Sequence, residues 1–301
     1  MLHNRASVNA IINKVMSNAN GIGESKARAK AESQTKGQNG QAISTKNHSI
    51  SSTQNMRSVT TQYVNFVKEN FSGKALANIN VESAKSFIDH KIQEGISLSS
   101  INTYISTMGK VADNLNELGH SNINREDITA YRTELKQEFG SLQSIHINRA
   151  NEDTNSIING MNQHTPFGLS AELQSQAGLR VDDAINLDKI KINEDNTLHI
   201  MGSKNGLDYT TKELNKDLID RVREAKEEGY QVGYSEYREA LKEVVQSTGQ
   251  EWNGTHSLRY DYAQNEYQEM RENGATDSEA LSTISLNMGH SREGITTHYL
   301  K

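Results

Sequence analysis

The sequence predicts a mainly α-helical protein of two domains, the second of which contains a small three-stranded antiparallel sheet. The chain has 301 residues, which at roughly 150 residues per domain favours two domains, each long enough to bury a core. From residue 52 onward apolar residues recur every three or four positions, the spacing of amphipathic helices. The block 187–214 instead alternates apolar and polar residues between turn-rich segments, as short strands do.

Residues 1–50 come first and are predicted to form a basic, partly disordered N-terminal arm. Residues 6–17 have the apolar spacing of one short helix. Residues 20–55 contain few large apolar side chains, a composition that indicates partial disorder or a solvated helix. Seven Lys or Arg residues against two Glu in the arm suit contact with DNA or with a partner. The alternative is a disordered, solubilising tail.

Residues 51–140 are predicted to form a four-helix domain. Each helix has a stripe of apolar residues, such as Val59, Tyr63 and Phe66 in the first of them. The expected helices span residues 54–70, 81–94 and 98–118, with a fourth that starts near 124. Gly95 and Gly119 fall where helices end, the position at which glycine is favoured.

Residues 141–301 are predicted to form the second domain, with residues 139–148 as the link. Helices are expected at 148–161, 167–178, 214–228, 235–247, 256–271 and 277–288. The strands are expected in LDKIKI, TLHIM and LDYTTKEL, and EDN and GSKNG make the turns between them. The last segment, SREGITTHYLK, is expected to be one short helix.

Composition restricts the classes of function. The chain has no cysteine, which excludes disulfides, zinc–thiolate sites and thiol catalysis. No apolar run approaches the ~20 residues of a membrane-spanning helix, and no signal-peptide core is evident, so a cytoplasmic protein without a membrane partner is expected. The net charge is −6, and residues 141–301 hold sixteen basic and twenty-six acidic residues. That half alone is therefore expected to bind DNA weakly.

Five features of the second domain could carry chemistry. They are GLRVDD with Arg180, GSKNG with Lys204, THSLRYDYA with His256 and Arg259, MGHSREGITTHY with His290, and Tyr299. Three residues separate His256 from Arg259, which places both on one face of a helix. Each feature taken alone has an ordinary structural explanation, for example a solvated lysine in a turn. All five features in this order and at this spacing are improbable by chance.

These motifs resemble those of the tyrosine recombinases, the phage-integrase family. GLRVDD resembles the family's first-arginine box with its following acid, HSLRYDYA its His-x-Leu-Arg-His-x-x-Ala box, and MGHSREGITTHY its Leu-Gly-His to Tyr box. GSKNG resembles the hairpin that carries the family's lysine. Three positions depart from the pattern: Tyr260 replaces His, Met288 replaces Leu, and Asn253-Gly254-Thr255 replaces the frequent Pro.

The resemblance implies a site-specific recombinase that needs neither metal nor cofactor. Residues 51–140 would be a SAM-like core-binding domain and residues 141–301 the catalytic domain. Tyr299 would attack phosphorus and store the bond as a 3′-phosphotyrosyl link. The resemblance assigns charge neutralisation to Arg180 and Arg259, leaving-group protonation to Lys204, proton removal from Tyr299 to His256, a phosphate hydrogen bond to His290, and orientation of Arg180 or His256 to Asp183.

The resemblance also implies an assembly of four protomers on two double-stranded DNA sites of a mobile genetic element, exchanging strands through a Holliday junction. An accessory DNA-bending or directionality protein would fit this scheme. Two alternatives stay open: a type IB topoisomerase, and a non-catalytic DNA-binding relative. Because only Leu300 and Lys301 follow Tyr299, we expect its segment to be poorly held without DNA, with the phenol away from Arg180 and Arg259. Docking of a further terminal helix on a neighbouring protomer is likewise in doubt.

Overall fold

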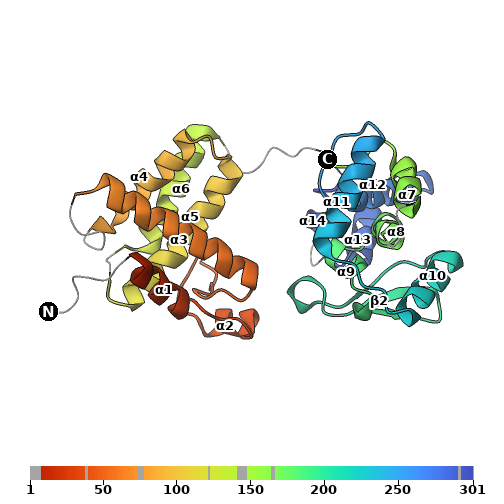
Figure 1. The fold of residues 1–301 in the computed structure, drawn as a ribbon, viewed down its shortest axis with the longest axis horizontal. Helices are drawn as coiled ribbons and strands as arrows, with labels where there is room; N and C mark the ends of the chain where they lie inside the picture. The colour runs from red at the N-terminus through yellow and green to blue at the C-terminus, as the bar shows by residue number, and fades with distance from the viewer. Residues whose placement is uncertain are drawn as a thin grey trace. The chain divides into compact units, whose positions relative to one another are not determined.

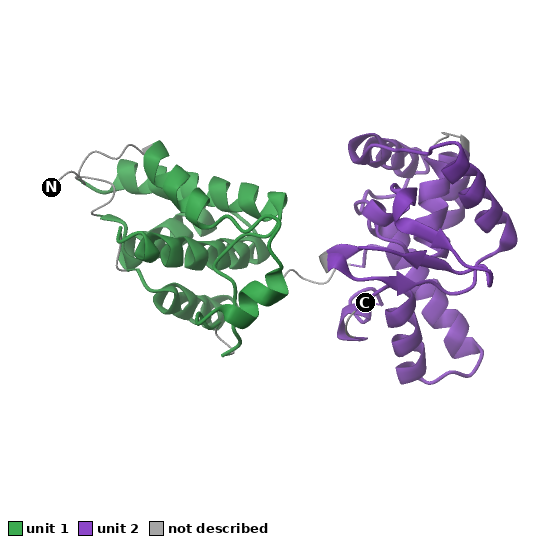
Figure 2. Cartoon of the chain, turned by 90° about the horizontal axis from the view of Figure 1, so that it is seen from below, with its two compact units in different colours: residues 1–145 green, residues 146–301 purple. Residues whose placement is uncertain are grey.

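The structure of the protein is a computed structural model, which describes residues 8–37, 40–72, 78–120, 123–140, 148–163, 167–290 and 293–300. The chain divides into two compact units, Met1–Ile145 and His146–Lys301 (Figures 1 and 2). Both are mainly helical, and unit 2 contains one small antiparallel sheet. This is the predicted fold class. Most of the predicted link at 139–148 lies outside the described residues.

The four predicted helices of unit 1 are α3 (Ile50–Asn70), α4 (Val81–Gln93), α5 (Leu98–Glu117) and α6 (Arg125–Phe139). Their apolar stripes meet in a single core, in which Tyr63, Phe87, Ile105 and Leu115 are fully buried. Helix α3 starts earlier than expected because Ser49 and Ser52 form a capping box at its first turn. Polar capping therefore sets this boundary, rather than the first apolar residue.

Residues 8–50 belong to unit 1 and are not a separate arm, which corrects the expectation from composition. Helix α1 (Val8–Asn18) buries Ile11, Ile12 and Val15 in the same core as α3 and α5. Each such side chain gains about 1.5–3 kcal/mol from leaving water, which favours docking of the helix. Helix α2 (Lys26–Glu32) buries none of its residues, as a solvated helix does.

Unit 2 contains the sheet, in the order β1-β2-β3, formed by Ile190–Ile192, Leu198–Ile200 and Tyr209–Thr210. In its antiparallel register Ile200 faces Ile190 on one side and Tyr209 on the other, and all three are buried. They pack against α10 (Lys216–Glu227) through its residues Leu218 and Val222. In Figure 1 the sheet and α10 form one layer of this unit, beside the remaining helices.

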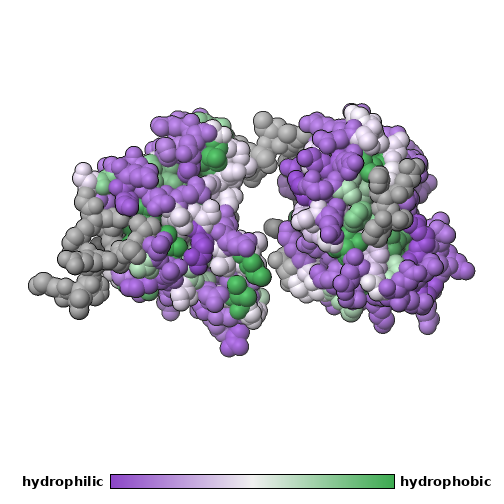
Figure 3. All heavy atoms as spheres, in the orientation of Figure 1, coloured by the Kyte–Doolittle hydropathy of each residue, from purple (hydrophilic) through white to green (hydrophobic). Residues whose placement is uncertain are grey.

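The helices of unit 2 outside the sheet layer include α12 (Ser257–Glu272) and six others. They are α7 (Thr154–Gln163), α8 (Gly168–Gln176), α9 (Val181–Ala184), α11 (Tyr234–Ser247), α13 (Asp277–Asn287) and α14 (Glu293–Thr296). Helix α12 packs against both α8 and α13. Helix α14 is shorter than the terminal helix predicted, and residues 297–300 form turns. None of the described helices is both long and apolar enough to cross a membrane. The visible surface is mostly hydrophilic (Figure 3).

Candidate active site

The predicted site residues stand at the ends of helices and in the turns beside them. Arg180 immediately precedes α9, His256 precedes α12, and Arg259 lies in the first turn of α12. Lys204 begins the short 3-10 turn Lys204–Gly206 between β2 and β3 and is exposed. Two further residues complete the set, His290 after α13 and Tyr299 after α14. The ends of helices α9, α12, α13 and α14 thus supply most of the candidate site.

Arg259 is the buried centre of this arrangement, with none of its surface exposed. Its guanidinium donates to the backbone carbonyls of Gly178 and Met288, and Nη2 also lies 3.0 Å from Nε2 of His290. These bonds join the turn before α9, the end of α13 and the start of α12. A buried cation is costly unless its donors are satisfied. The two carbonyls satisfy Nη1 and Nη2 in part, whereas Nε is buried without a hydrogen-bond partner in the described structure.

The contacts of His290 determine which of its ring nitrogens carries the proton. A guanidinium can only donate, so Nε2 of His290 accepts from Arg259, and Nδ1–H donates to Oγ1 of Thr296 at 2.9 Å. Burial and the nearby charges of Arg259 and Arg180 lower the pKa of His290 to about 3. Because both nitrogens are engaged within the protein, a hydrogen bond to a phosphate oxygen requires one of these bonds to be exchanged.

Tyr299 lies against Arg259, so the expectation that its phenol would be held away from this arginine is wrong. Its ring centroid is 5.8 Å from the guanidinium carbon of Arg259, 5.3 Å from the His290 ring and 4.5 Å from the Tyr260 ring. Its backbone carbonyl accepts a 2.8 Å hydrogen bond from Nε2 of Gln264. Residues of α12 therefore hold the tyrosine.

Arg180 is joined to the same corner through the end of α13. Its Nη2 donates to the carbonyl of Gly289 at 3.0 Å, next to the Met288 carbonyl held by Arg259. Its Nη1 donates to Oγ of Ser203 at 3.0 Å. Burial lowers the pKa of Arg180, and the positive charge of Arg259 lowers it further. Two mutually repelling guanidiniums at one corner favour an anion beside them.

Asp183 is buried next to Arg180 and contacts Ser203, Arg180 and Lys189 through its carboxylate. Its Oδ2 accepts a 2.5 Å hydrogen bond from Ser203 and lies 4.0 Å from Nη1 of Arg180, and Oδ1 lies 3.9 Å from Nζ of Lys189. The carboxylate therefore faces Arg180 directly and through Ser203, as expected if it orients that arginine. Ser203 also immediately precedes Lys204, so this network holds one end of the lysine turn.

Tyr209 is a residue of the site that the motifs did not identify. It lies on β3, where its ring packs 5.7 Å from the guanidinium carbon of Arg180 and its hydroxyl lies 3.5 Å from Oδ2 of Asp183. Gly289 makes room for this ring, since a Cβ there would come within 2.5 Å of it. A buried aromatic in a short strand usually indicates core packing, so no sequence signal separated Tyr209 from the rest of the core.

The charged groups around His256, among them Lys204, determine its protonation state. Burial and the positive charges of Arg259, Arg180 and Lys204 lower the pKa of His256 to about 4. The imidazole is therefore neutral near pH 7, the form that can accept a proton. Lys204 is exposed, and its positive charge contributes, after burial and the two arginines, to the lowered pKa of both histidines.

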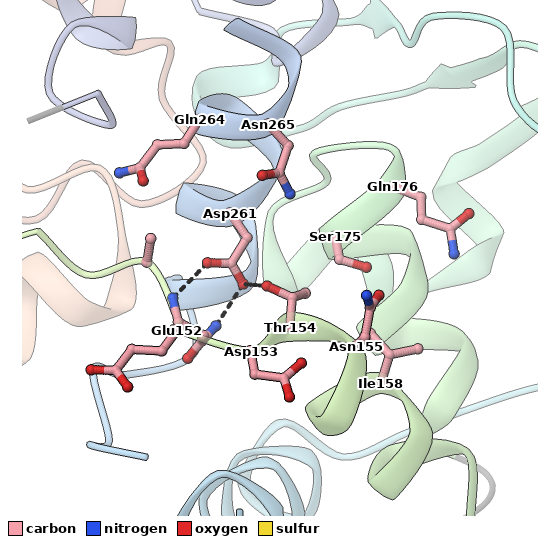
Figure 4. Close-up of a pocket in the computed structure, with 12 residues that line it drawn as sticks. Glu152, Asp153, Thr154, Asn155, Ile158, Ser175, Gln176, Asp261, Gln264 and Asn265 are labelled. Carbon is pink, nitrogen blue, oxygen red and sulfur yellow. Dashed lines mark hydrogen bonds between the residues drawn. The ribbon is translucent and has the colours of Figure 1, made fainter. Parts of the chain in front are cut away.

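A polar pocket of about 500 Å³ lies elsewhere in unit 2, where residues 150–158 meet α8 and α12 (Figure 4). None of the predicted site residues lines it. Asp261, from α12, accepts hydrogen bonds of 2.6 Å from N and Nδ2 of Asn151 and of 2.8 Å from Oγ1 of Thr154. These bonds pin the chain before α7 to α12, which explains why α7 begins later than residue 148.

Comparison with known proteins identifies the fold. No protein-family model and no curated protein sequence matches the chain. Solved structures do match, and they show that the chain has the tyrosine recombinase fold, the fold of the family that its motifs resemble. A lambda integrase tetramer bound to a Holliday junction matches with a TM-score of 0.62 and 15% identity, over 99% of this chain and 78% of that one.

Two further matches come from other recombination systems. The XerH site-specific recombinase bound to a palindromic difH substrate has a TM-score of 0.57 and 13% identity, over 82% of this chain and 74% of that one. The Tn1549 transposon integrase in complex with a circular intermediate DNA has a TM-score of 0.56 and 9% identity, over 96% and 95% of the two chains. At these identities the likeness concerns the fold, and the chemistry has to be argued from the site.

Proposed function

We propose that the protein is a site-specific DNA recombinase that cleaves and rejoins DNA with Tyr299 as its nucleophile. The observation that carries this proposal is the convergence of Arg180, Arg259, His290 and Tyr299 at the end of α13. Those residues come from separate segments of the chain, and the motifs had singled out all four from the sequence. The fold, shared with DNA-bound recombinases, supports the same conclusion.

In the proposed reaction the Tyr299 oxygen attacks phosphorus, and the bond from phosphorus to the 5′ oxygen breaks. Neutral His256 takes the phenolic proton, and Lys204 gives a proton to the departing 5′ oxygen. Arg180 and Arg259 stabilise the extra negative charge of the pentacoordinate state. The product is a 3′-phosphotyrosyl link with a free 5′ hydroxyl. In the second half of the exchange, a 5′ hydroxyl of the partner strand attacks this phosphorus, and the Tyr299 oxygen leaves.

The DNA-free arrangement has to open before Arg259 can contact a phosphate. The guanidinium is fully buried, and Tyr299 and His290 both lie against it. An arriving phosphate oxygen would replace Nε2 of His290 as an acceptor for Arg259. To donate to that phosphate, His290 would then exchange its Nδ1–H bond to Thr296 or take up a proton at Nε2. We infer that DNA binding itself completes the site, consistent with a reaction that is confined to the assembled complex.

The proposed partner is double-stranded DNA that carries specific recombination sites. One tyrosine per protomer implies four protomers on two sites, with a Holliday junction as the intermediate and, in some reactions, an accessory DNA-bending or directionality protein. Lambda integrase forms such a tetramer on a Holliday junction. A cytoplasmic setting and an origin in a mobile element belong to the same proposal.

A nicked suicide substrate tests the nucleophile. The unaltered chain should form a covalent protein–DNA adduct, and Tyr299→Phe should abolish the adduct while it binds the same duplex nearly as well. Arg180→Ala should slow adduct formation by at least about 10²- to 10³-fold, the usual cost of one preorganised donor. An adduct formed by the Phe variant would refute the assignment of Tyr299.

Two alternatives make different predictions in the same assays. The complete burial of Arg259 and the acidic unit 2 favour a non-catalytic DNA-binding relative, which would give no adduct with the unaltered chain. A type IB topoisomerase would form the adduct but reseal the same strand. Relaxation of supercoils without exchange between two cognate sites would support it over the recombinase.

A further inference from the structure

The turn that carries Lys204 is attached to unit 2 by one buried side chain. In the segment 201–208, every residue whose surface the structure describes is exposed except Ser203, which keeps 5% of its surface accessible. Gly202 and Gly206 have φ of +57° and +73°, and no atom beyond the adjacent residues lies within 4 Å of a Cβ built at either. Glycines leave the backbone of such a turn free to adopt other conformations, so the contacts of Ser203 determine where the turn lies.

The Ser203 hydroxyl joins this turn to the arginine site. It donates to Oδ2 of Asp183 at 2.5 Å and accepts from Nη1 of Arg180 at 3.0 Å. Both partners are charged, and hydrogen bonds to charged groups are stronger than those between neutral groups. Asp183 is almost fully buried, so removal of the hydroxyl takes away the shortest hydrogen bond of a carboxylate that water reaches poorly. The two bonds therefore hold Ser203 firmly against the site.

The backbone of Ser203 closes the turn around Lys204. Its N–H donates to the carbonyl of Leu207 at 3.0 Å, and its carbonyl accepts from the N–H of Gly206 at 2.8 Å. Lys204 is the next residue in the chain and begins the 3-10 turn that these two bonds enclose. A displacement of Ser203 is therefore passed on to the backbone of Lys204.

Tyr209 holds the opposite end of the same turn. Its ring lies 5.7 Å from the guanidinium carbon of Arg180, and its hydroxyl lies 3.5 Å from Oδ2 of Asp183. This is the carboxylate oxygen that also accepts from Ser203. Both ends of the lysine turn thus rest on Arg180 and Asp183, while the part between them is exposed.

We propose that Ser203 is a positioning residue that places Lys204 for protonation of the departing 5′ oxygen. The inference deepens the proposed function and rests on it, since Lys204 acts here as the leaving-group acid. The 5′ oxygen and the oxygens that Arg180 neutralises belong to one phosphate, so the acid and the arginine have to keep a fixed spacing. The bonds of Ser203 to Arg180 and Asp183 maintain that spacing, and a misplacement of about 1 Å can slow a reaction about 10²-fold.

A nicked suicide substrate with sulfur in place of the bridging 5′ oxygen tests this role in the full-length chain. When the Tyr299 oxygen attacks that phosphorus, the phosphorus–sulfur bond breaks and the sulfur leaves as a thiolate, because a thiol has a pKa of about 8.5, far below that of an alcohol. His256 takes the phenolic proton as before, and Lys204 keeps its own. Ser203→Ala should cleave the oxygen substrate about 10- to 100-fold more slowly than the unaltered chain, but the sulfur substrate at close to the unaltered rate.

Three further variants serve as controls. Lys204→Ala lacks the acid itself and should lose about 10²- to 10⁴-fold on oxygen, with the same rescue by sulfur. Ser203→Thr keeps the hydroxyl and should cleave both substrates at close to the unaltered rate. Ser170→Ala removes another buried hydroxyl of unit 2, which bonds to the carbonyl of Ala184 at 3.0 Å, and should leave the ratio of the two rates unchanged.

An equal loss on both substrates for Ser203→Ala would overturn the proposal, because Ser203 would then act through Arg180 or through the fold and not through Lys204. An undiminished rate on the oxygen substrate would overturn it too. The same holds for a Lys204→Ala defect that sulfur does not rescue, since Lys204 would then not be the acid.

The absence of a covalent adduct from the unaltered chain on either substrate would instead refute the recombinase function. Hydrogen exchange at the amide of Gly206 in the DNA-free protein then tests the attachment of the turn separately. Exchange should be about 10-fold or more faster in Ser203→Ala than in Ser203→Thr. Equal exchange in the two variants would show that the Ser203 hydroxyl does not hold the turn, whatever the reaction.

Discussion

Tyr260 should act as a positioning residue for Tyr299, and its truncation should slow cleavage by a modest, calculable factor. The two ring centroids lie 4.5 Å apart, and one turn further along α12 Gln264 holds the Tyr299 carbonyl. An aromatic pair at this distance contributes about 0.5–1.5 kcal/mol beyond the area that it buries. Tyr260→Ala should therefore reduce the population of correctly placed Tyr299, and with it the cleavage rate, by about 2- to 13-fold.

The assay is single-turnover cleavage of the nicked suicide substrate at saturating protein, with the DNA dissociation constant measured alongside. Tyr260→Phe is the matched control, because it keeps the ring and should cleave at close to the unaltered rate. If the truncation acted only on stability, Tyr260→Ala would lower the melting temperature, but Tyr260→Ala and Tyr260→Phe would cleave at similar rates. An unchanged or faster rate for Tyr260→Ala would refute the reasoning, since docking of Tyr299 would then be neutral or inhibitory.

Three further predictions concern stability. The pKa values of His256 and His290 lie at about 4 and about 3 in the folded chain and near 6.5 when unfolded, so the unfolded state binds more protons below about pH 6.5. The free energy of unfolding should therefore fall as the pH drops from about 6.5 toward about 4. Urea titrations should show this fall, and a smaller one in His290→Gln. Gly289→Ala should cost at least about 1–3 kcal/mol, because φ is +61° and the new Cβ would meet the Tyr209 ring; an unchanged denaturation midpoint would contradict this. Asp261→Ala, which loses three hydrogen bonds to a buried carboxylate, should cost about 1.5–3 kcal/mol or more, with protease cleavage near residue 150 as the local measurement.

The motifs of unit 2 are local, and this is why the sequence reveals them. GLRVDD and HSLRYDYA each lie within one helix start, so the relation between Arg259 and His256 follows from helical spacing alone. The three strands follow from alternation and turn residues in the same way. By contrast, Tyr209 gave no signal, because its contact with Arg180 joins β3 to a turn twenty-nine residues earlier in the chain.

The N-terminal segment also shows that local sequence patterns do not specify contacts between distant segments. Its composition is polar enough to suggest an arm, yet α1 has one apolar face, and only the exposed surface of α3 and α5 decides whether that face is buried. Once α1 docks, the chain up to residue 48 returns along α5, where Asn47 pairs with Ala19 and Asn20. This return brings Lys46 and Asn47 against Lys110 of α5, a contact that charge counts alone could not predict.

By itself the sequence predicted the fold class, most of the helical and strand segments, and the candidate site residues from Arg180 to Tyr299, since each depends on spacing within a short stretch of chain. Tertiary structure decided how those residues meet: that Arg259 is buried under Tyr299, that His290 accepts from it, and that Tyr260 holds the tyrosine near the end of the chain. These are contacts between segments that are distant in sequence. Their geometry depends on how helices pack, which no local pattern of residues specifies.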